Sequence, residues 1–144
     1  KSEEGVLKAL SHSLSYDVFQ FHENMMKQDF ETAFDIFFKV ARNREELTRF
    51  VGLLVSKFFP MLVAKQGMEA GWNQARTAVE IAERLKMRPY PAELAVRDSL
   101  RFSEEQLKNA VRKLGELDEN IKTFVYTKAF LGVRRLFLEI YACL

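Results

Sequence analysis

The sequence has few of the residues that build catalytic, metal or disulfide sites. Its 144 residues include one cysteine, Cys143, and two histidines, His12 and His22. One cysteine excludes an internal disulfide and fits a reducing, cytoplasmic compartment. Neither histidine has the companions of a Cys-His or Ser-His-Asp site, and a metal site needs several converging ligands. We therefore expect a domain that is not an enzyme and has no cofactor or metal, with Cys143 as an inert core residue and His22 at the surface or half-buried.

Charge of one sign and long apolar runs are also scarce. The 22 basic and 20 acidic residues are mixed and give a net charge of only +2, which is weak support for nucleic-acid binding. The longest apolar run, residues 50–64, is interrupted by Gly52, Ser56, Lys57 and Pro60, so we predict no membrane span. The chain starts with Lys1 and shows no signal peptide. We expect a fragment of a longer protein, in which residues 1–14 are the end of a linker.

The residues that are abundant favour helices. Only six Gly and three Pro occur, hydrophobic residues make up 48% of the chain, and 13 of its residues are Phe. Leu, Ala, Glu, Lys and Arg are also frequent. We predict one all-α domain over residues 15–144, a compact bundle of about six to seven helices with an aromatic and aliphatic core.

Capping residues predict where the first three helices begin. Ser15 or Asp17 would cap a helix through Met26, Asp29 a second helix and Asn43 a third. Pro60 lies inside the third and should kink it or end it near Phe59.

The second half of the chain predicts four more helices. One runs from about residue 73 to 86 and buries Ala75, Val79, Ala82 and Leu85. Pro89 and Pro91 separate it from a helix over about 92–101. Ser103 with Gln106 forms a capping box that starts the next helix. The last helix, from about Thr127, is apolar on nearly every side and should be buried, either in this core or against a partner.

Asp118 is the polar residue that most needs an explanation. It lies on or beside the apolar stripe formed by Leu107, Val111, Leu114, Leu117 and Ile121, where an unpaired carboxylate would be costly. Lys122 is one turn further on, and Arg134 or Arg135 could also reach it. We interpret Asp118 as part of a polar clasp between the last two helices, and a contact to a neighbouring subunit is the alternative. Trp72 either anchors a loop or is an exposed interface residue.

Two other classes of function remain open. Residues 77–101 have the pattern of a helix-turn-helix, which would make the protein a DNA-binding regulator. Its second helix begins Pro91-Ala92-Glu93-Leu94 and carries Asp98, with Arg97 and Arg101 as its only cations, so it is poorly suited to reading bases. An effector-binding helical bundle is the third hypothesis and would require a lined apolar cavity.

Three motifs occur in order along the second half of the chain. They are Arg88-Pro89-Tyr90, the segment from Phe102 to Leu107 (FSEEQL), and Leu117-Asp118 followed by Lys122-Thr123. In order and spacing the chain resembles, from about Tyr16 to Leu144, the C-terminal helical domain of the delta subunit of the bacterial DNA polymerase III clamp loader. Two features depart from the family: Phe124 stands where Gly often follows Lys-Thr, and Pro60 is unusual in the central helix.

The resemblance implies an assembly domain rather than a catalytic one. In that family the C-terminal domain is a helical collar that joins delta to the other subunits of a pentamer, the gamma/tau-type ATPase and delta-prime. The sliding clamp and primed DNA would be contacted only through upstream domains or the whole complex, and no membrane is involved. The residues that match family motifs, as packing or interface candidates, are Arg88, Pro89, Tyr90, Phe102, Leu107, Leu117, Asp118 and Lys122.

Overall fold

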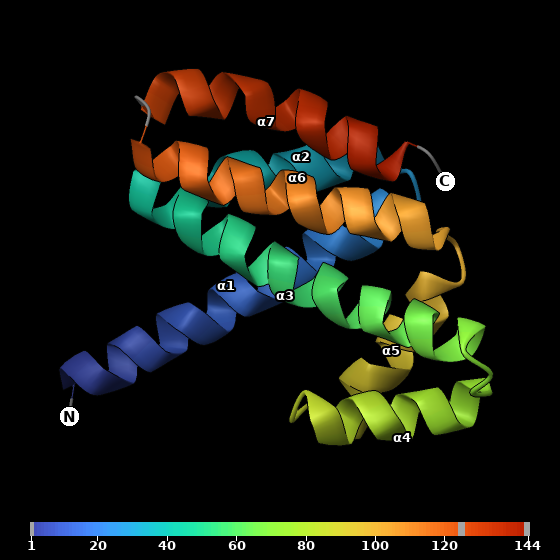
Figure 1. Cartoon of the computed structure of the whole chain (residues 1–144). Helices are drawn as coiled ribbons and strands as arrows, with labels where there is room; N and C mark the ends of the chain where they lie inside the picture. Colours follow the sequence, from blue (N-terminus) through green and yellow to red (C-terminus); the bar gives the residue numbers. More distant parts are fainter. Residues whose placement is uncertain (1, 124–125, 143–144) are drawn as a thin grey trace. The chain divides into compact units, whose positions relative to one another are not determined.

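The structure, a computed structural model, describes residues 2–123 and 126–142, and the side chains within 13–122 and 132–142. Over these residues it contains seven helices and no strand, which confirms the all-α prediction (Figure 1). In chain order they are α1 (Ser2–Met26), α2 (Phe30–Val40), α3 (Arg44–Glu69), α4 (Gln74–Arg84), α5 (Pro89–Ser99), α6 (Glu104–Thr123) and α7 (Tyr126–Tyr141).

The helices form two compact units. Unit 1 comprises Lys1–Leu54 and Leu117–Ala142, and unit 2 comprises Val55–Glu116. Unit 1 therefore holds α1, α2 and α7, and unit 2 holds α4 and α5. The two long helices, α3 and α6, contribute residues to both units.

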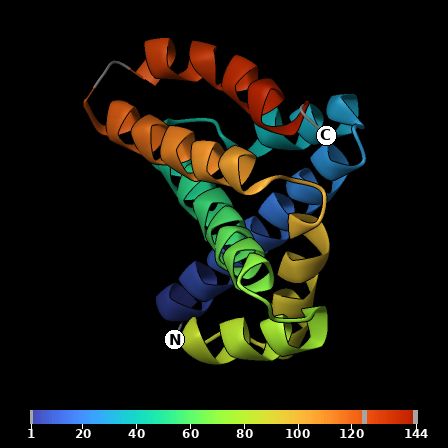
Figure 2. The same cartoon turned by 45° about the vertical axis from the view of Figure 1, so that its right-hand side comes forward.

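Unit 1 has an aromatic core. Phe21 of α1 lies at its centre, with ring centroids 5.0 Å from Phe50, 5.1 Å from Phe137 and 6.2 Å from Phe37. The rings of Phe37 and Phe137 are 5.3 Å apart, so α2 and α7 meet over the same core (Figures 1 and 2). Most of these pairs are edge-to-face, the arrangement that the charge distribution of aromatic rings favours.

Unit 2 is built from smaller side chains around a helical hairpin. α4 and α5 pack against each other, burying Thr77 and Ile81 from α4 and Ala92, Ala95 and Val96 from α5. Figure 2 shows this hairpin next to the end of α3. Phe58 of α3 meets Phe102, just before α6, edge-to-face at 5.9 Å. Leu107, Ala110 and Leu114 of α6 are buried as well.

Three of the predicted helix starts are confirmed by side-chain caps. Asp29 Oδ1 accepts from the Thr32 backbone N–H at 3.3 Å, and Asn43 Oδ1 accepts from that of Glu46 at 2.9 Å. At the start of α6, Ser103 Oγ accepts from the Gln106 N–H at 3.1 Å. Gln106 Oε1 accepts from the Ser103 N–H at 2.9 Å, which completes the capping box.

The predicted start of the first helix is wrong. α1 begins at Ser2, so Ser15 and Asp17 lie inside the helix and do not cap it. A serine or aspartate is favourable at a helix start but does not force one, and the residues before it are themselves compatible with a helix. The predicted end at Met26 is confirmed.

The prediction that Pro60 ends the third helix is also wrong. α3 continues through Pro60 to Glu69, so only the alternative of a local distortion remains open. A proline costs the helix one hydrogen bond and a local clash, which burial of Pro60 among core residues can offset. Gly67, near the end of the chain segment that follows Pro60, also belongs to the helix.

α3 bears on the prediction that no segment spans a membrane. With 26 residues it is long and apolar enough to cross a membrane by length and composition alone, although the apolar run is interrupted. Core helices of soluble proteins can have the same length and composition. Phe50, Leu54, Phe58 and Met61 are fully or almost fully buried, as in a core helix.

The buried faces of the last four helices differ partly from prediction. In α4 the buried residues are Thr77 and Ile81, whereas Ala75 and Val79, predicted to be buried, are exposed. α5 begins three residues early, with Pro89 in its first turn, where a proline is favourable.

The predicted stripe of α6 is confirmed: Leu107, Leu114, Leu117 and Ile121 are buried, and Val111 is half-buried. α7, predicted to be buried all round, has an exposed face with Arg134, Arg135 and Glu139 over the side chains that are described. Cys143 lies outside the described residues.

Candidate interaction surface

The residues predicted from family motifs fall into two groups by burial. Phe102, Leu107 and Leu117 are buried, with exposed fractions of 3%, 0% and 7%. Phe102 packs against Phe58 in unit 2. These three side chains hold the domain together and are not available to a partner, so of the two roles left open for them the structure favours packing.

The first motif is exposed. Arg88 occupies the N-cap position of α5 without a side-chain cap, and Pro89 begins the helix. The Tyr90 side chain, in the first turn, is 65% exposed. An aromatic side chain this exposed, beside an exposed arginine, is typical of interaction surfaces.

The polar pair predicted at the end of α6 is present but joins one helix only. Lys122 Nζ lies 2.9 Å from Asp118 Oδ2, and this hydrogen bond raises the pKa of Lys122 above its ordinary value. Arg134 instead lies over the Phe34 ring at 5.4 Å, and Arg135 pairs with Glu139. The prediction of a clasp between the last two helices through these arginines is therefore wrong. The Asp118 side chain is 27% exposed, so it keeps partial contact with solvent. Its ion pair with Lys122 on the same helix compensates the charge of the carboxylate.

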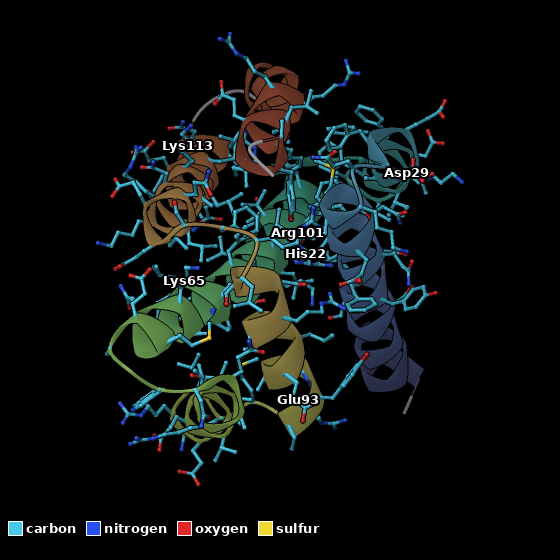
Figure 3. The ribbon with its side chains drawn as sticks, turned by 90° about the vertical axis from the view of Figure 1, so that its right-hand side faces the viewer. His22, Asp29, Lys65, Glu93, Arg101 and Lys113 are labelled. Atoms are coloured by element: carbon cyan, nitrogen blue, oxygen red, sulfur yellow. The ribbon has the colours of Figure 1, made fainter. Side chains whose placement is uncertain are left out.

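The structure also corrects the interpretation of His22. His22, labelled in Figure 3, is buried (2% exposed). Its Nδ1 is hydrogen-bonded to the Tyr141 hydroxyl at 2.7 Å, which ties α1 to α7 within unit 1. Each of these polar groups satisfies the other in an otherwise aromatic core. Their separation of 119 residues explains why no local pattern revealed the pair.

Metal and acid-base chemistry find no support in the described part of the chain. No group of three or more His, Cys, Asp or Glu side chains there could hold a metal ion. Figure 3 shows that the labelled Lys65, Glu93 and Lys113 come from three different helices, α3, α5 and α6.

A polar network joins the end of α3 to the start of α6 in unit 2. Glu104 Oε2 accepts from Gln66 Nε2 at 3.3 Å and lies 3.3 Å from Lys108 Nζ. The pKa of Glu104 is lowered, most by its hydrogen bond with Glu69 and then by those with Gln66 and Lys108. Gln66 and Lys108 stabilise the charged carboxylate. The role of this network is structural, because it connects the end of α3 to the start of α6.

Exposed apolar side chains are the clearest candidates for contacts with other proteins. Among the described side chains, six large ones are at least 45% exposed: Tyr16, Phe38, Phe59, Val79, Tyr90 and Leu100. Single exposed apolar residues are common on protein surfaces. Four of the six belong to unit 2, where Val79 also lies on the face of α4 that was predicted to be buried.

Trp72 forms the best-defined surface feature, which we call the Trp72 cluster: Trp72, Arg76 and Arg84. The guanidinium carbons of Arg76 and Arg84 lie 5.0 and 5.2 Å from the centroid of the indole ring. The half-buried indole packs closely on Gly67 of α3. Trp72 thus anchors the α3–α4 turn, the first of the two alternatives, and the interface alternative stays a prediction for its half-buried indole.

Comparison with known proteins identifies the family. A family model described as "DNA polymerase III delta subunit, C-terminal domain" matches residues 15–138, most of the chain. The chain belongs to this family. The resemblance recognised from the three motifs is therefore confirmed, and with it the nature of the domain as the C-terminal domain of a DNA polymerase III delta subunit.

Two relatives of the delta-subunit domain agree with this assignment. The DNA polymerase III subunit delta of Bacillus subtilis (strain 168) is 26% identical over 120 residues, which cover 83% of the chain and 33% of that protein. A solved structure, the Bacillus subtilis DNA clamp loader delta protein (YqeN), superposes with a TM-score of 0.74 at 23% identity. The superposition covers 90% of this chain and 37% of the Bacillus subtilis protein, and it supports the assignment of the fold. The chain thus spans about a third of the length of these relatives.

Proposed function

We propose that this delta-subunit domain is an assembly module of a clamp loader, joining its own subunit to the others of the complex. The observation that carries the proposal is the family match over residues 15–138. The structurally similar relative from Bacillus subtilis, a DNA clamp loader delta protein by name, adds support.

The surface of the domain is suited to binding other proteins. Large apolar side chains are exposed on both units, among them Tyr90 and Val79 in unit 2 and Phe38 in unit 1. A stable protein interface buries about 800 Å² on each partner, with aromatic and arginine side chains contributing most of the affinity. Such side chains on two or more helices would supply contacts to neighbouring subunits.

The partners are, in this proposal, a gamma/tau-type ATPase and delta-prime, arranged with delta in a pentamer in the cytoplasm. The domain itself performs no catalysis. ATP-driven opening of the sliding clamp and its placement on primed DNA would belong to the rest of the complex. The domain would hold together the ring within which those steps occur.

Co-elution in size-exclusion chromatography tests the proposal. The 144-residue chain is mixed with the ATPase and delta-prime subunits of the same organism, and separately with duplex DNA. Elution of the chain with the subunits, and not with DNA, is the expected result. Failure to associate with either subunit, while the chain remains helical by circular dichroism, would refute the assembly role.

The alternative is a DNA-binding regulator that uses residues 77–101. α4 and α5 do form a helical hairpin, but α5 begins with Pro89-Tyr90-Pro91 and carries Glu93 in its first half. Arg97, one of its two expected cations, is paired with Asp98 at 2.7 Å. Binding of duplex DNA that weakens steeply with salt, without subunit association, would favour this alternative.

A further inference from the structure

The indole of Trp72 is held in one place by the turn between α3 and α4. The Trp72 backbone N–H donates to the Gly67 carbonyl at 3.0 Å, and the ring lies against Gly67 itself. A Cβ atom at position 67 would come within 2.5 Å of Trp72 Cε3, closer than real Cβ contacts. Gly67 is therefore the residue that lets the ring pack on α3.

The two arginines over this ring differ in their ion pairs. Arg84 Nε lies 3.1 Å from Glu80 Oε1, so its charge is already compensated within α4. The exposed Arg76 contacts the indole, and of the residues that the structure describes none forms an ion pair with it. Among the described residues the cluster thus presents one guanidinium without a direct ion pair, and the aromatic ring restricts its position.

We infer that the Trp72 cluster binds a carboxylate on an acidic segment of a neighbouring clamp-loader subunit, an inference that rests on the function proposed above. A planar guanidinium can hold a carboxylate through two parallel hydrogen bonds. Stacking on the indole limits the conformations of Arg76 before binding, which lowers the entropy lost when the complex forms. Tryptophan and arginine are also the residue types most enriched where interfaces gain their affinity.

The charges around the cluster favour a protein carboxylate over the phosphates of DNA. A polyanion is bound by several cations together, whereas Glu80 compensates Arg84, and Glu83 adds an exposed negative charge to α4. Arg76, which has no direct ion pair with a described residue, matches one acidic side chain flanked by apolar ones. Val79 lies three residues after Arg76 on the same helix and is 59% exposed. It offers an apolar contact for such a segment.

Charge reversal at Arg76 is the first arm of the test. The dissociation constant of the 144-residue chain for the ATPase and delta-prime subunits is measured for the native chain, for Arg76→Glu and for Arg49→Glu. Arg49 is a matched control, since it is an exposed helical arginine in unit 1 that pairs with Glu45. We expect Arg76→Glu to weaken binding about tenfold and Arg49→Glu to leave it unchanged. The difference should shrink as salt is raised.

The second arm uses the only tryptophan of the chain as a probe. With 5-fluorotryptophan incorporated, the single ¹⁹F resonance should shift when the subunits are added. Gly67→Ala keeps both arginines but displaces the ring, so it should also weaken binding while the chain remains helical by circular dichroism.

The outcomes separate this inference from the proposed function. If the native chain does not associate with the subunits, the assembly role fails and the inference falls with it. If the native chain binds and Arg76→Glu binds equally well, with no ¹⁹F shift, only the inference is overturned. A ¹⁹F shift caused by primed DNA alone would show that the cluster binds phosphate and would overturn the carboxylate assignment.

Discussion

Unit 1 and unit 2 bury different kinds of side chain. Unit 1 surrounds Phe21 with rings from α2, α3 and α7, and its central contacts join residues far apart in the sequence. Unit 2 packs mainly alanines and branched side chains, with the phenylalanine pair Phe58 and Phe102, and its helix ends are fixed by a capping box, a Trp–Gly contact and the Glu104 network. Four of the six exposed large apolar side chains on the described residues belong to unit 2.

The difference suggests a division of roles. An aromatic core makes many contacts through few residues, so a single substitution in it is costly. In unit 2, contacts at the helix ends contribute to holding the helices together, and more of the surface of α4 and α5 is left exposed. We therefore expect stability to depend most on unit 1 and partner binding to depend most on unit 2.

The largest effect is expected from Phe21→Ala. Removing the central ring should lower the free energy of unfolding by about 3–5 kcal/mol, measured by denaturant titration. Phe38→Ala is the control, because Phe38 is 48% exposed and should cost about 1 kcal/mol or less. Equal losses for the two variants would contradict the description of unit 1 as a core centred on Phe21.

Tyr141→Phe should come next. It removes the hydroxyl bonded to His22 and leaves a buried polar nitrogen without that partner, at a cost of about 1–3 kcal/mol. Tyr16→Phe, which changes the same group on a 61% exposed side chain, should leave stability unchanged. If Tyr141→Phe is as stable as the native chain, the hydrogen bond does not contribute to holding α7 on α1.

Ser103→Ala should have a smaller effect, through a corner of unit 2. Loss of the capping box is expected to cost about 1 kcal/mol. Ser15→Ala tests the corrected start of α1, because alanine inside a helix is as good as serine or better. A loss of stability in Ser15→Ala comparable to that of Ser103→Ala would restore Ser15 as a cap.

The smallest expected effect is on how the free energy of unfolding depends on pH, and the variant that tests it is Glu104→Gln. The pKa of Glu104 is lowered in the folded chain from the ordinary value of 4.5, so the contacts that its carboxylate receives from Gln66 and Lys108 stabilise the fold at pH values above 4.5. That contribution should disappear as the pH falls through the lowered pKa. The stability difference between the native chain and Glu104→Gln should be constant at neutral pH and diminish in acid, as urea titrations at several pH values can measure. A difference that stays constant throughout the acid range would show that Glu104 is not stabilised in its charged form.

Local chemistry explains what the sequence predicted well. Caps at Asp29, Asn43 and Ser103 act within one turn, so their signals lie within four residues. The stripe of α6 was also predicted, because its opposite face is strongly polar. The end of α4 was less visible because no glycine marks it: the helix ends at Arg84 rather than at about 86, and Lys86 adopts a positive φ angle of 54°.

Tertiary contacts decided the features that the sequence did not predict. α4 carries small or apolar residues on two faces, Ala75 and Val79 on one and Thr77 and Ile81 on the other. The second face is the buried one in the structure, where α4 packs against α5. The burial of His22 depends on Tyr141, and the position of Trp72 depends on Gly67 having no side chain. The exposed Tyr90 was found as a motif residue, but its exposure follows from α5 beginning at Pro89.

The division of the chain also bears on the order in which it can fold during synthesis. Over the described residues, unit 2 is one continuous segment, Val55–Glu116, set between the two segments of unit 1. As the chain leaves the ribosome, these residues emerge before Phe137 and Tyr141, which close the core of unit 1. Phe21 and Phe37 must therefore wait, incompletely covered, until α7 has been added. The aromatic core that gives the finished domain its stability is the part of the nascent chain most exposed to aggregation and to chaperones.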